Sequence, residues 1–182
     1  MKILALVGSP RRGGNTDLLV DALLEGAREA GVQAWKVYLA DLQIAPCDGC
    51  RICRSTGECI HDDDMSPLYD RLFEADVWVV GTPVYWWGPS AQTKLFIDRW
   101  YRFAGDGRWR VRGKKAVLVS AFGDEKPDTP RHLVGMLSDA FAYLGMDFVG
   151  QVLVSASEAG EVAGNRAALD QARDMGRRVA RS

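Results

Sequence analysis

Short, continuous apolar runs alternate with amphipathic stretches five times along the chain. Successive apolar residues are typical of strands that are buried on both faces of a parallel sheet. The runs cover residues 3–7, 34–39, 77–80, 116–119 and 148–154, the second being the weakest. Between and after them, apolar residues recur at helical spacing over residues 19–30, 68–75, 91–103, 130–144 and 165–181. The alternation therefore predicts five β-α units.

Repeated β-α units require right-handed crossovers, which place helices on both faces of a parallel sheet. With one switch point, five strands take the flavodoxin-like order 2-1-3-4-5. We therefore expect an α/β, flavodoxin-like three-layer fold. Because the chain has 182 residues, 47% of them hydrophobic, one domain over residues 1–182 is expected. Two irregular segments, 43–63 and 105–113, stand out within it, and long loops in a compact domain are often functional.

The charge balance excludes two classes of partner. A formal net charge of −1, with acids and bases mixed along the sequence, gives no electrostatic basis for binding nucleic acid or a membrane surface. The apolar start is too short for a signal peptide, and no later run approaches the length of a membrane span. We therefore expect a cytoplasmic protein, whose four cysteines bind metal or do redox work rather than form structural disulfides.

The first strand runs directly into the sequence GSPRRGGNT, residues 8–16. Ligands of such sheets bind beyond the carboxyl ends of the strands, where the first turn presents backbone N–H groups and a helix N-terminus. Gly13 and Gly14 let the backbone approach closely, and Ser9, Asn15 and Thr16 supply polar donors. The plainer alternative is a tight turn in which Asn15 caps the helix. Because neither a P-loop nor a Rossmann glycine pattern is present, a single phosphate is favoured.

Aromatic residues follow the third strand, at the same edge of the sheet. The sequence GTPVYWWGPSAQTKLFIDRW, residues 81–100, places Pro83, Val84, Tyr85, Trp86 and Trp87 there. Aromatic side chains beside an anion site favour a ligand with a flat ring. The alternative is that the two tryptophans belong to the core or to a subunit interface.

Together with SAFG, residues 120–123, these loops resemble the three FMN-binding loops of the flavodoxin-like NAD(P)H-dependent FMN reductases, and the similarity extends over nearly the whole chain. The resemblance implies that one loop holds the FMN phosphate, that a second lines the isoalloxazine, and that a third covers its other side. The implied residues are, in that order, Ser9, Arg11, Asn15 and Thr16; Pro83, Val84, Tyr85, Trp86 and Trp87; and Ser120, Ala121, Phe122 and Gly123.

The four cysteines, Cys47, Cys50, Cys53 and Cys59, have the spacing C-x2-C-x2-C-x5-C. This crowding suits thiolate ligation of a four-iron, four-sulfur cluster, whereas structural zinc sites more often use two separated pairs. The run resembles the cysteine motif of the iron-sulfur flavoproteins, a branch of the same fold that passes electrons between such a cluster and FMN. Three states stay open for these cysteines: a cluster, free or redox-reactive thiols, and zinc.

The resemblance implies an oxidoreductase that passes electrons from NAD(P)H through FMN to a quinone, a flavin or another small acceptor. Because the cofactor does the chemistry, no catalytic side chain is expected. An alternative is an iron-sulfur flavoprotein that takes single electrons from a ferredoxin. An alternative of another class is a non-enzymatic zinc- or thiol-based sensor. The family resemblance also implies a homodimer or homotetramer.

Two charged groups have plainer interpretations. A basic cluster is expected to be a solvated face, or else a dock for the 2′-phosphate of NADPH or for an acidic partner; its members are Arg99, Arg102, Arg108, Arg110, Arg112, Lys114 and Lys115. Residues 62–64 are three aspartates before a predicted helix that Ser66 and Pro67 are expected to begin. We expect these aspartates to cap that helix.

Overall fold

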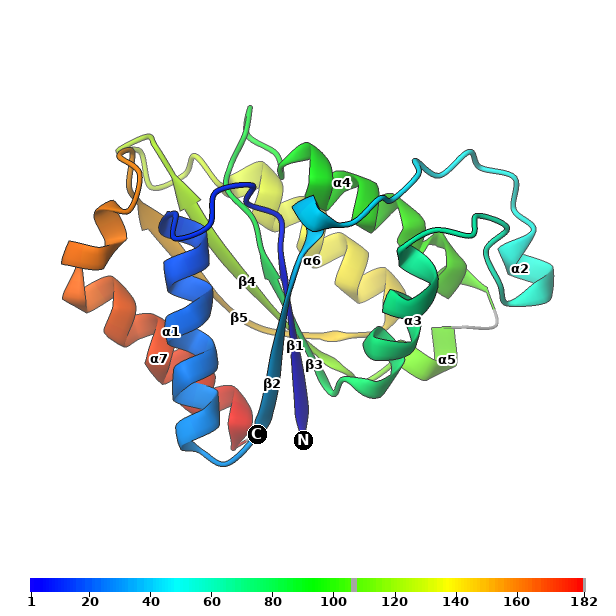
Figure 1. Cartoon of the computed structure of the whole chain (residues 1–182), viewed down its shortest axis with the longest axis horizontal. Helices are drawn as coiled ribbons and strands as arrows, with labels where there is room; N and C mark the ends of the chain where they lie inside the picture. Colours follow the sequence, from blue (N-terminus) through cyan, green and yellow to red (C-terminus); the bar gives the residue numbers. More distant parts are fainter. Residues whose placement is uncertain (106–107, 182) are drawn as a thin grey trace.

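The five apolar runs form one parallel sheet in a computed structural model of the chain, which describes residues 1–105 and 108–181 except for the side chain of Arg108 (Figure 1). The strands are β1 (Lys2–Val7), β2 (Gln33–Tyr38), β3 (Val77–Gly81), β4 (Lys115–Phe122) and β5 (Asp147–Ser155). Their order is β2-β1-β3-β4-β5, and every neighbouring pair is parallel. The predicted fold class and strand order are confirmed.

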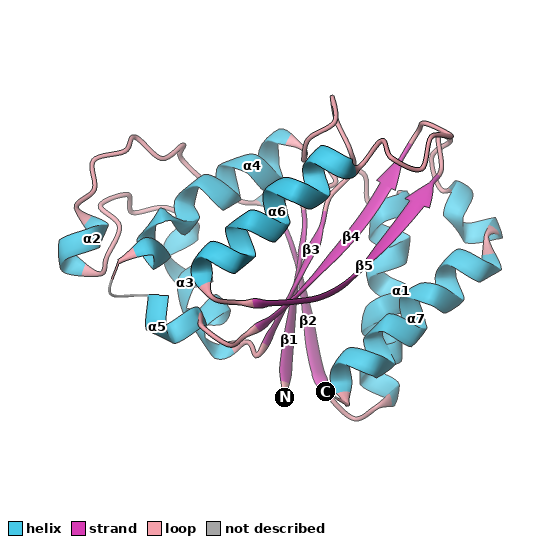
Figure 2. Ribbon diagram, turned by 180° about the vertical axis from the view of Figure 1, so that it is seen from behind, coloured by secondary structure: helices cyan, strands magenta, loops and turns pink. Residues whose placement is uncertain are grey.

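Helices cover both faces of the sheet (Figure 2). On one face lie α1 (Asn15–Glu29) and α7 (Arg166–Ala180), and on the other lie α3 (Met65–Glu74), α4 (Ala91–Asp98) and α6 (Arg131–Leu144). Side chains alternate along β1, so that Ile3 and Val7 pack in the core under α1 and α7, whereas Leu4 and Leu6 pack in the other core. None of the helices in the described ranges combines the length and the apolar composition that crossing a bilayer requires.

Several element boundaries differ from the expectations. The segment 91–103 is not one helix, because the α-helix ends at Asp98 and continues as the 3-10 helix η2 (Arg99–Ala104). The irregular segments contain two short helices, α2 (Cys53–Thr56) and α5 (Arg108–Val111). Further short helices are η1 (Leu39–Asp41) and η3 (Glu161–Gly164).

The start of α3 corrects the expectation for Ser66 and Pro67. The helix begins at Met65, so both residues lie inside its first turn. The carboxylate of Asp63 accepts a hydrogen bond from the Met65 N–H at 3.0 Å. Asp63, one residue before the N-cap, therefore satisfies the first N–H of the helix, whereas the N-cap residue Asp64 makes no side-chain capping hydrogen bond. Ser66 is not the cap.

Two glycines allow α1 and α7 to approach until their backbones touch. A Cβ added to Gly176 would lie 1.9 Å from the Leu23 carbonyl oxygen, and one added to Gly26 would lie 2.1 Å from the Arg173 carbonyl oxygen. Ion pairs flank this contact: Arg173 with Glu25 at 2.8 Å and Arg177 with Glu29 at 2.7 Å. The contact fixes α1, whose N-terminus faces the carboxyl edge of the sheet.

Replacing Gly176 by Ala is expected to lower the free energy of unfolding by about 2 kcal/mol, because the helices must separate to admit a methyl group. A matched control is Gly135→Ala in α6, where an added Cβ meets nothing within 4 Å. It should raise stability by about 0.5 kcal/mol through helix propensity. Urea denaturation of both variants measures the effects, and a Gly176→Ala variant as stable as wild type would show that the helices are not packed this closely.

Candidate functional site

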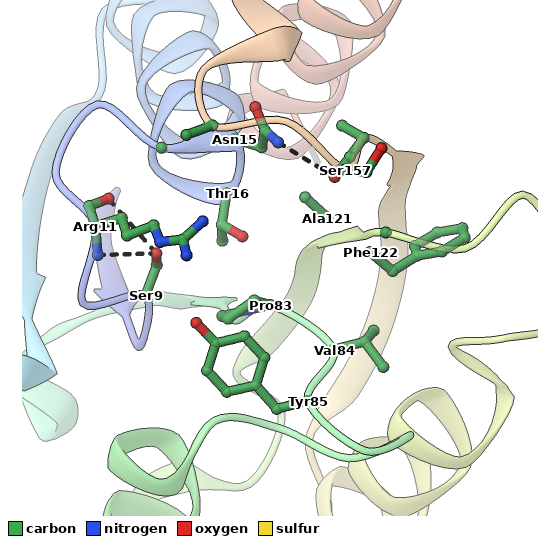
Figure 3. Close-up of a pocket in the computed structure, with 14 residues that line it drawn as sticks. Ser9, Arg11, Asn15, Thr16, Pro83, Val84, Tyr85, Ala121, Phe122 and Ser157 are labelled. Atoms are coloured by element: carbon green, nitrogen blue, oxygen red, sulfur yellow. Dashed lines mark hydrogen bonds between the residues drawn. The ribbon is translucent and has the colours of Figure 1, made fainter.

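A pocket opens where the carboxyl ends of four strands meet (Figure 3). It encloses about 530 Å³, counting its open mouth. Four segments line it, those after β1, β3, β4 and β5. The lining residues are Ser9, Arg11, Gly14, Asn15, Thr16, Pro83, Val84, Tyr85, Ala121, Phe122, Gly123, Ala156, Ser157 and Ala159. The structure therefore brings the three predicted loops together, as the sequence indicated.

Close packing of Gly8 against α4 joins the first two of these loops. The Gly8 N–H donates to the Gly81 carbonyl at 2.7 Å, and the Ser90 hydroxyl donates to the Gly8 carbonyl at 2.6 Å. A Cβ on Gly8 would lie 1.7 Å from the Thr93 Oγ1, so only glycine fits there without a shift of α4. The loop after β1 is thus fixed against the N-terminus of α4.

The loop after β1 curls around the start of α1. The Ser9 Oγ accepts a hydrogen bond from the Arg11 N–H at 3.2 Å, and the Gly14 N–H donates to the Arg11 carbonyl at 3.1 Å. Gly13 has a φ of +67°, a conformation that favours glycine, and its N–H donates to the Asp17 carboxylate at 2.8 Å. The first N–H groups of α1, which have no partners within a helix, consequently face the pocket.

A buried carboxylate braces this loop from behind. Asp17 also accepts hydrogen bonds from the Lys36 ammonium at 2.9 Å and from the Tyr38 hydroxyl at 3.1 Å. Burial acts to lower the pKa of Lys36, but hydrogen bonds with Asp21, Tyr38 and Asp17 outweigh it and raise that pKa above its usual value. Lys36 therefore stays charged, and the brace persists at neutral pH.

The two adjacent arginines have different surroundings. Arg12 forms a 2.5 Å ion pair with Asp41 and lies over the Tyr38 ring, 4.0 Å from its centroid. The Arg11 side chain extends into the pocket beside Thr16 (Figure 3). Within the described part of the chain, the Arg11 guanidinium has no hydrogen bond or ion pair. One unpaired cation thus stands at the N-terminus of α1.

Asn15 contacts a segment that the sequence analysis missed. Its amide nitrogen donates to the carbonyls of Ala156 and Glu158 at 3.2 and 2.7 Å, and its Oδ1 accepts from the Val162 N–H at 3.1 Å. The N-cap position itself belongs to Gly14. Asn15 therefore fastens the loop after β5 to the pocket, and its own role as a phosphate ligand stays a prediction. The available signal was the fifth apolar run, which ends at the same edge.

The predicted ring-binding residues separate into two groups. Pro83, Val84 and Tyr85 line the pocket, and the Val84 N–H donates to the Ala121 carbonyl at 3.1 Å. Trp86 and Trp87 line an adjoining cavity, and their contact with a cofactor stays a prediction.

The predicted loop after β4 also contributes unequally. Ala121, Phe122 and Gly123 line the pocket, whereas Ser120 is fully buried beneath it. The Ser120 hydroxyl donates to the Thr82 carbonyl at 2.7 Å. Ser120 therefore ties the end of β3 to β4, and its contact with a cofactor stays a prediction.

The cysteine-rich loop, residues 43–63, lies at the opposite end of the molecule from the loop after β5 and contributes no residue to the pocket (Figure 1). Cys47 and Cys50 are exposed, Cys53 is buried and Cys59 is partly buried, all as free thiols. Burial and the neighbouring charges of Cys59, Cys50 and Cys47 raise the pKa of Cys53. Among the described residues, no group of three or more His, Cys, Asp or Glu side chains is arranged so that it could hold a metal ion. The four-cysteine metal site stays a prediction.

Arg99 holds the two ends of this loop together. This corrects the prediction that Arg99 lies on a solvated basic face. Its side chain is fully buried and forms a 2.5 Å ion pair with Asp63. The same guanidinium donates to the Ala45 carbonyl at 2.9 Å and to the Cys59 Sγ at 3.3 Å. Burial acts to raise the pKa of Asp63, but hydrogen bonds from Arg99, Ala45 and Met65 lower it below its usual value.

Of the other members of the basic cluster, Arg110 and Arg112 are exposed, as predicted, whereas Arg102, Lys114 and Lys115 are partly buried. Arg102 donates to the Gly57 carbonyl at 2.7 Å, Arg110 lies 3.4 Å from the Phe73 ring centroid, and the Lys114 amine donates to two backbone carbonyls. Burial lowers the pKa of Lys114. Lys115 begins β4, at the sheet edge opposite the pocket. The Arg108 side chain lies outside the described residues, and the dock for a 2′-phosphate stays a prediction.

Comparisons of the sequence and of the fold with known proteins identify relatives of this chain. The profile of the NADPH-dependent FMN reductase family matches residues 1–161. The chain is 32% identical to an iron-sulfur flavoprotein of Methanocaldococcus jannaschii, over 99% of this chain and 96% of the relative. It is 30% identical to a protein of Bacillus subtilis provisionally described as an NAD(P)H-dependent FMN-containing oxidoreductase, over 94% of each chain. The solved structure of a Trp repressor binding protein from Bacillus subtilis superposes with a TM-score of 0.74 at 27% identity, covering 96% of this chain and 98% of that one.

Replacing Arg99 by Leu is expected to lower the free energy of unfolding by about 3 kcal/mol, because the partly buried Asp63 carboxylate is left unpaired. The control is Lys94→Met, which breaks the exposed Lys94–Asp98 pair of α4. It should lower the free energy of unfolding by about 0.5 kcal/mol.

The Arg99–Asp63 pair also predicts that the stability of the fold depends on pH. Because the pKa of Asp63 is lowered on folding, its stabilising contribution is present above the unfolded pKa of about 3.9 and is lost as the pH falls through the folded value. In Asp63→Asn, the free energy of unfolding should lack this part of its decrease at acid pH. Equal stabilities of the Arg99 and Lys94 variants in urea, or an unchanged acid profile, would contradict this role of the Arg99–Asp63 pair.

Proposed function

Since the chain belongs to the NADPH-dependent FMN reductase family, we propose that this FMN-dependent oxidoreductase passes electrons from NAD(P)H through bound FMN to a quinone, a flavin or another small acceptor. The observation that carries the proposal is the unpaired guanidinium of Arg11 inside the pocket, at the N-terminus of α1. The pocket residues fit FMN at both of its ends.

The phosphate end of FMN fits the loop after β1. A phosphate monoester requires several donors and a positive potential, which unpaired helix N–H groups and one arginine supply. Ser9 and Thr16 add hydroxyl groups on the same side of the pocket. Both side chains are buried, so their positions are fixed before any ligand arrives.

The ring end of FMN fits the other wall of the pocket. Tyr85 and Phe122 provide aromatic surface, and Pro83 and Val84 provide apolar surface next to it. The Tyr85 ring faces the open centre of the pocket in Figure 3. Because a flat heterocycle needs apolar walls and a few polar contacts at its edge, these residues support an isoalloxazine ring at this wall.

FMN, when bound, supplies the hydride chemistry between the nicotinamide and the acceptor. The side chains of the chain itself bind and orient: Arg11 holds the charged tail, Tyr85 and Phe122 fix the plane of the ring, and Asn15 keeps the loop after β5 in place. No side chain is required as a general acid or nucleophile. NADH and NADPH are both compatible with these residues.

Replacing Arg11 by Ala is expected to weaken FMN binding by about 30-fold, the loss of one charge-assisted contact with a phosphate. Riboflavin has no phosphate, so neither wild type nor Arg11→Ala can make the phosphate contact with it. Its affinity should therefore change by less than about two-fold. Arg12→Ala is the control, since Arg12 is paired with Asp41 outside the pocket. Quenching of flavin fluorescence during titration measures all six affinities, and equal effects of Arg11→Ala on FMN and riboflavin would contradict the placement of the phosphate.

The cysteine-rich loop supports a second candidate function, that of an iron-sulfur flavoprotein that exchanges single electrons with a ferredoxin. Its support is the complete four-cysteine spacing together with the 32% identity to a relative of that name. This loop contributes no residue to the pocket of its own chain (Figure 1). For this second function we therefore propose a homodimer or homotetramer in which the cysteine-rich loop of one copy lies beside the pocket of another. Family membership argues against the non-enzymatic sensor.

This second function predicts about four iron and four sulfide per chain after anaerobic purification, since one cubane cluster uses four thiolates. Replacing Cys53 by Ser should lower the iron content to below about one atom per chain. Iron and zinc are measured by plasma emission and sulfide by colorimetry. A wild-type protein that contains zinc, or no metal, would leave the first function in place and remove the second.

A further inference from the structure

Trp86 and Trp87 occupy a strained two-residue turn. The N–H groups of Tyr85 and Gly88 each donate to the other residue's carbonyl, at 2.9 and 3.0 Å. Both tryptophans between them have a positive φ, +50° and +62°. Such turns normally carry Asn and Gly, because a side chain is strained in the left-handed region.

Exposure adds a second cost to this turn. Trp86 is 90% exposed and Trp87 48% exposed, with ring centroids 6.0 Å apart. The backbone strain and the exposed aromatic surface both raise the free energy of this turn while nothing is bound to it. Such features gather where a ligand is bound.

The two indoles form part of a cavity that continues from the main pocket. This cavity, about 480 Å³ with its open mouth, shares Val84, Phe122 and Gly123 with that pocket. Its other lining residues are Trp86, Trp87, Asp124 and Thr129. A molecule in it would therefore lie directly beside the wall to which the proposed function assigns the isoalloxazine.

Asp124 gives this aromatic cavity a negative charge. Its carboxylate accepts hydrogen bonds from the Lys126 N–H at 3.0 Å and from the Thr129 hydroxyl at 2.8 Å. These hydrogen bonds, the first of them above all, hold the pKa of Asp124 below its usual value. The positive charge of Lys126 also lowers the pKa of Asp124. Lys126 is not among the residues that line the cavity, and none of those residues is basic.

We propose that Trp86, Trp87 and Asp124 form the acceptor site and select acceptors by charge, favouring planar aromatic molecules that are cationic or neutral over anionic ones. Indole faces attract cations through their negative potential, and a carboxylate beside them adds to that attraction. The proposal rests on the proposed function, because it assigns the acceptor of that same site. With a quinone, NAD(P)H and one solvent proton deliver two electrons and two protons, forming hydroquinone and NAD(P)⁺.

Three naphthoquinones of different charge test the proposal: menadione, 1,2-naphthoquinone-4-sulfonate and a trimethylammonium-substituted naphthoquinone. Their kcat/KM values are measured at saturating NAD(P)H and divided by their rates with free reduced FMN. Asp124→Asn should raise the corrected value of the sulfonate about five-fold and lower that of the cation about five-fold, the effect of one unit charge at close range. Menadione should change by less than about two-fold, because it carries no charge.

Two further variants serve as controls. Asp128→Asn removes an exposed carboxylate four residues away that pairs with Arg131 and does not line the cavity, so all three ratios should stay as in wild type. Trp86→Leu should lower all three kcat/KM values about ten-fold, since it removes stacking surface without changing charge. Unchanged ratios in Asp124→Asn, or equal changes in Asp128→Asn, would overturn the proposal.

A binding measurement keeps this test separate from the proposed function. Equilibrium dialysis compares N-methylquinolinium with naphthalene-2-sulfonate, neither of which needs turnover, on the chain with and without FMN. Wild type should bind the cation more tightly, and Asp124→Asn should remove the preference. Equal binding by wild type overturns the acceptor site, whereas failure to bind FMN overturns the proposed function. If Trp86→Leu instead dissociates an oligomer and leaves binding unchanged, a second copy covers the tryptophans and the proposal is wrong.

Discussion

The pocket depends on the contact between the end of β1 and the start of α4, where Gly8 leaves room for the Ser90 and Thr93 side chains. Parallel strands bring their carboxyl ends to one edge of the sheet, but this contact decides that the loops after β1 and β3 meet there. Once they meet, the first turn of α1 and the aromatic wall around Tyr85 face the same space. A ligand with an anionic tail and a planar head follows from that juxtaposition.

The second feature that organises the molecule is the buried pair of Arg99 and Asp63. It closes a 21-residue segment, 43–63, whose own sequence contains only one short helix. The guanidinium reaches Ala45 near one end of the segment and Cys59 near the other. The four thiols are therefore presented on a loop that the core holds, and a metal group would bind to an anchored segment rather than to a free one.

The sequence predicts the fold well, because continuous apolar runs and helical spacing directly reflect burial on the two faces of a sheet. It also indicates that Arg11, Thr16, Tyr85 and Phe122 lie near one another, since each lies at or shortly after the carboxyl end of a strand, and all four line the pocket. It fails where a contact joins residues far apart in the chain. Nothing local in the sequence shows that Asn15 binds the loop after β5 or that Arg99 pairs with Asp63.

A crystal structure of the chain soaked with FMN would test the central claim most directly. The account predicts that the phosphate lies against the first turn of α1 with the Arg11 guanidinium beside it, and that the ring lies against Tyr85 and Phe122. FMN bound with its phosphate toward the loop after β4, or bound outside the four loops at the carboxyl edge of the sheet, would contradict it.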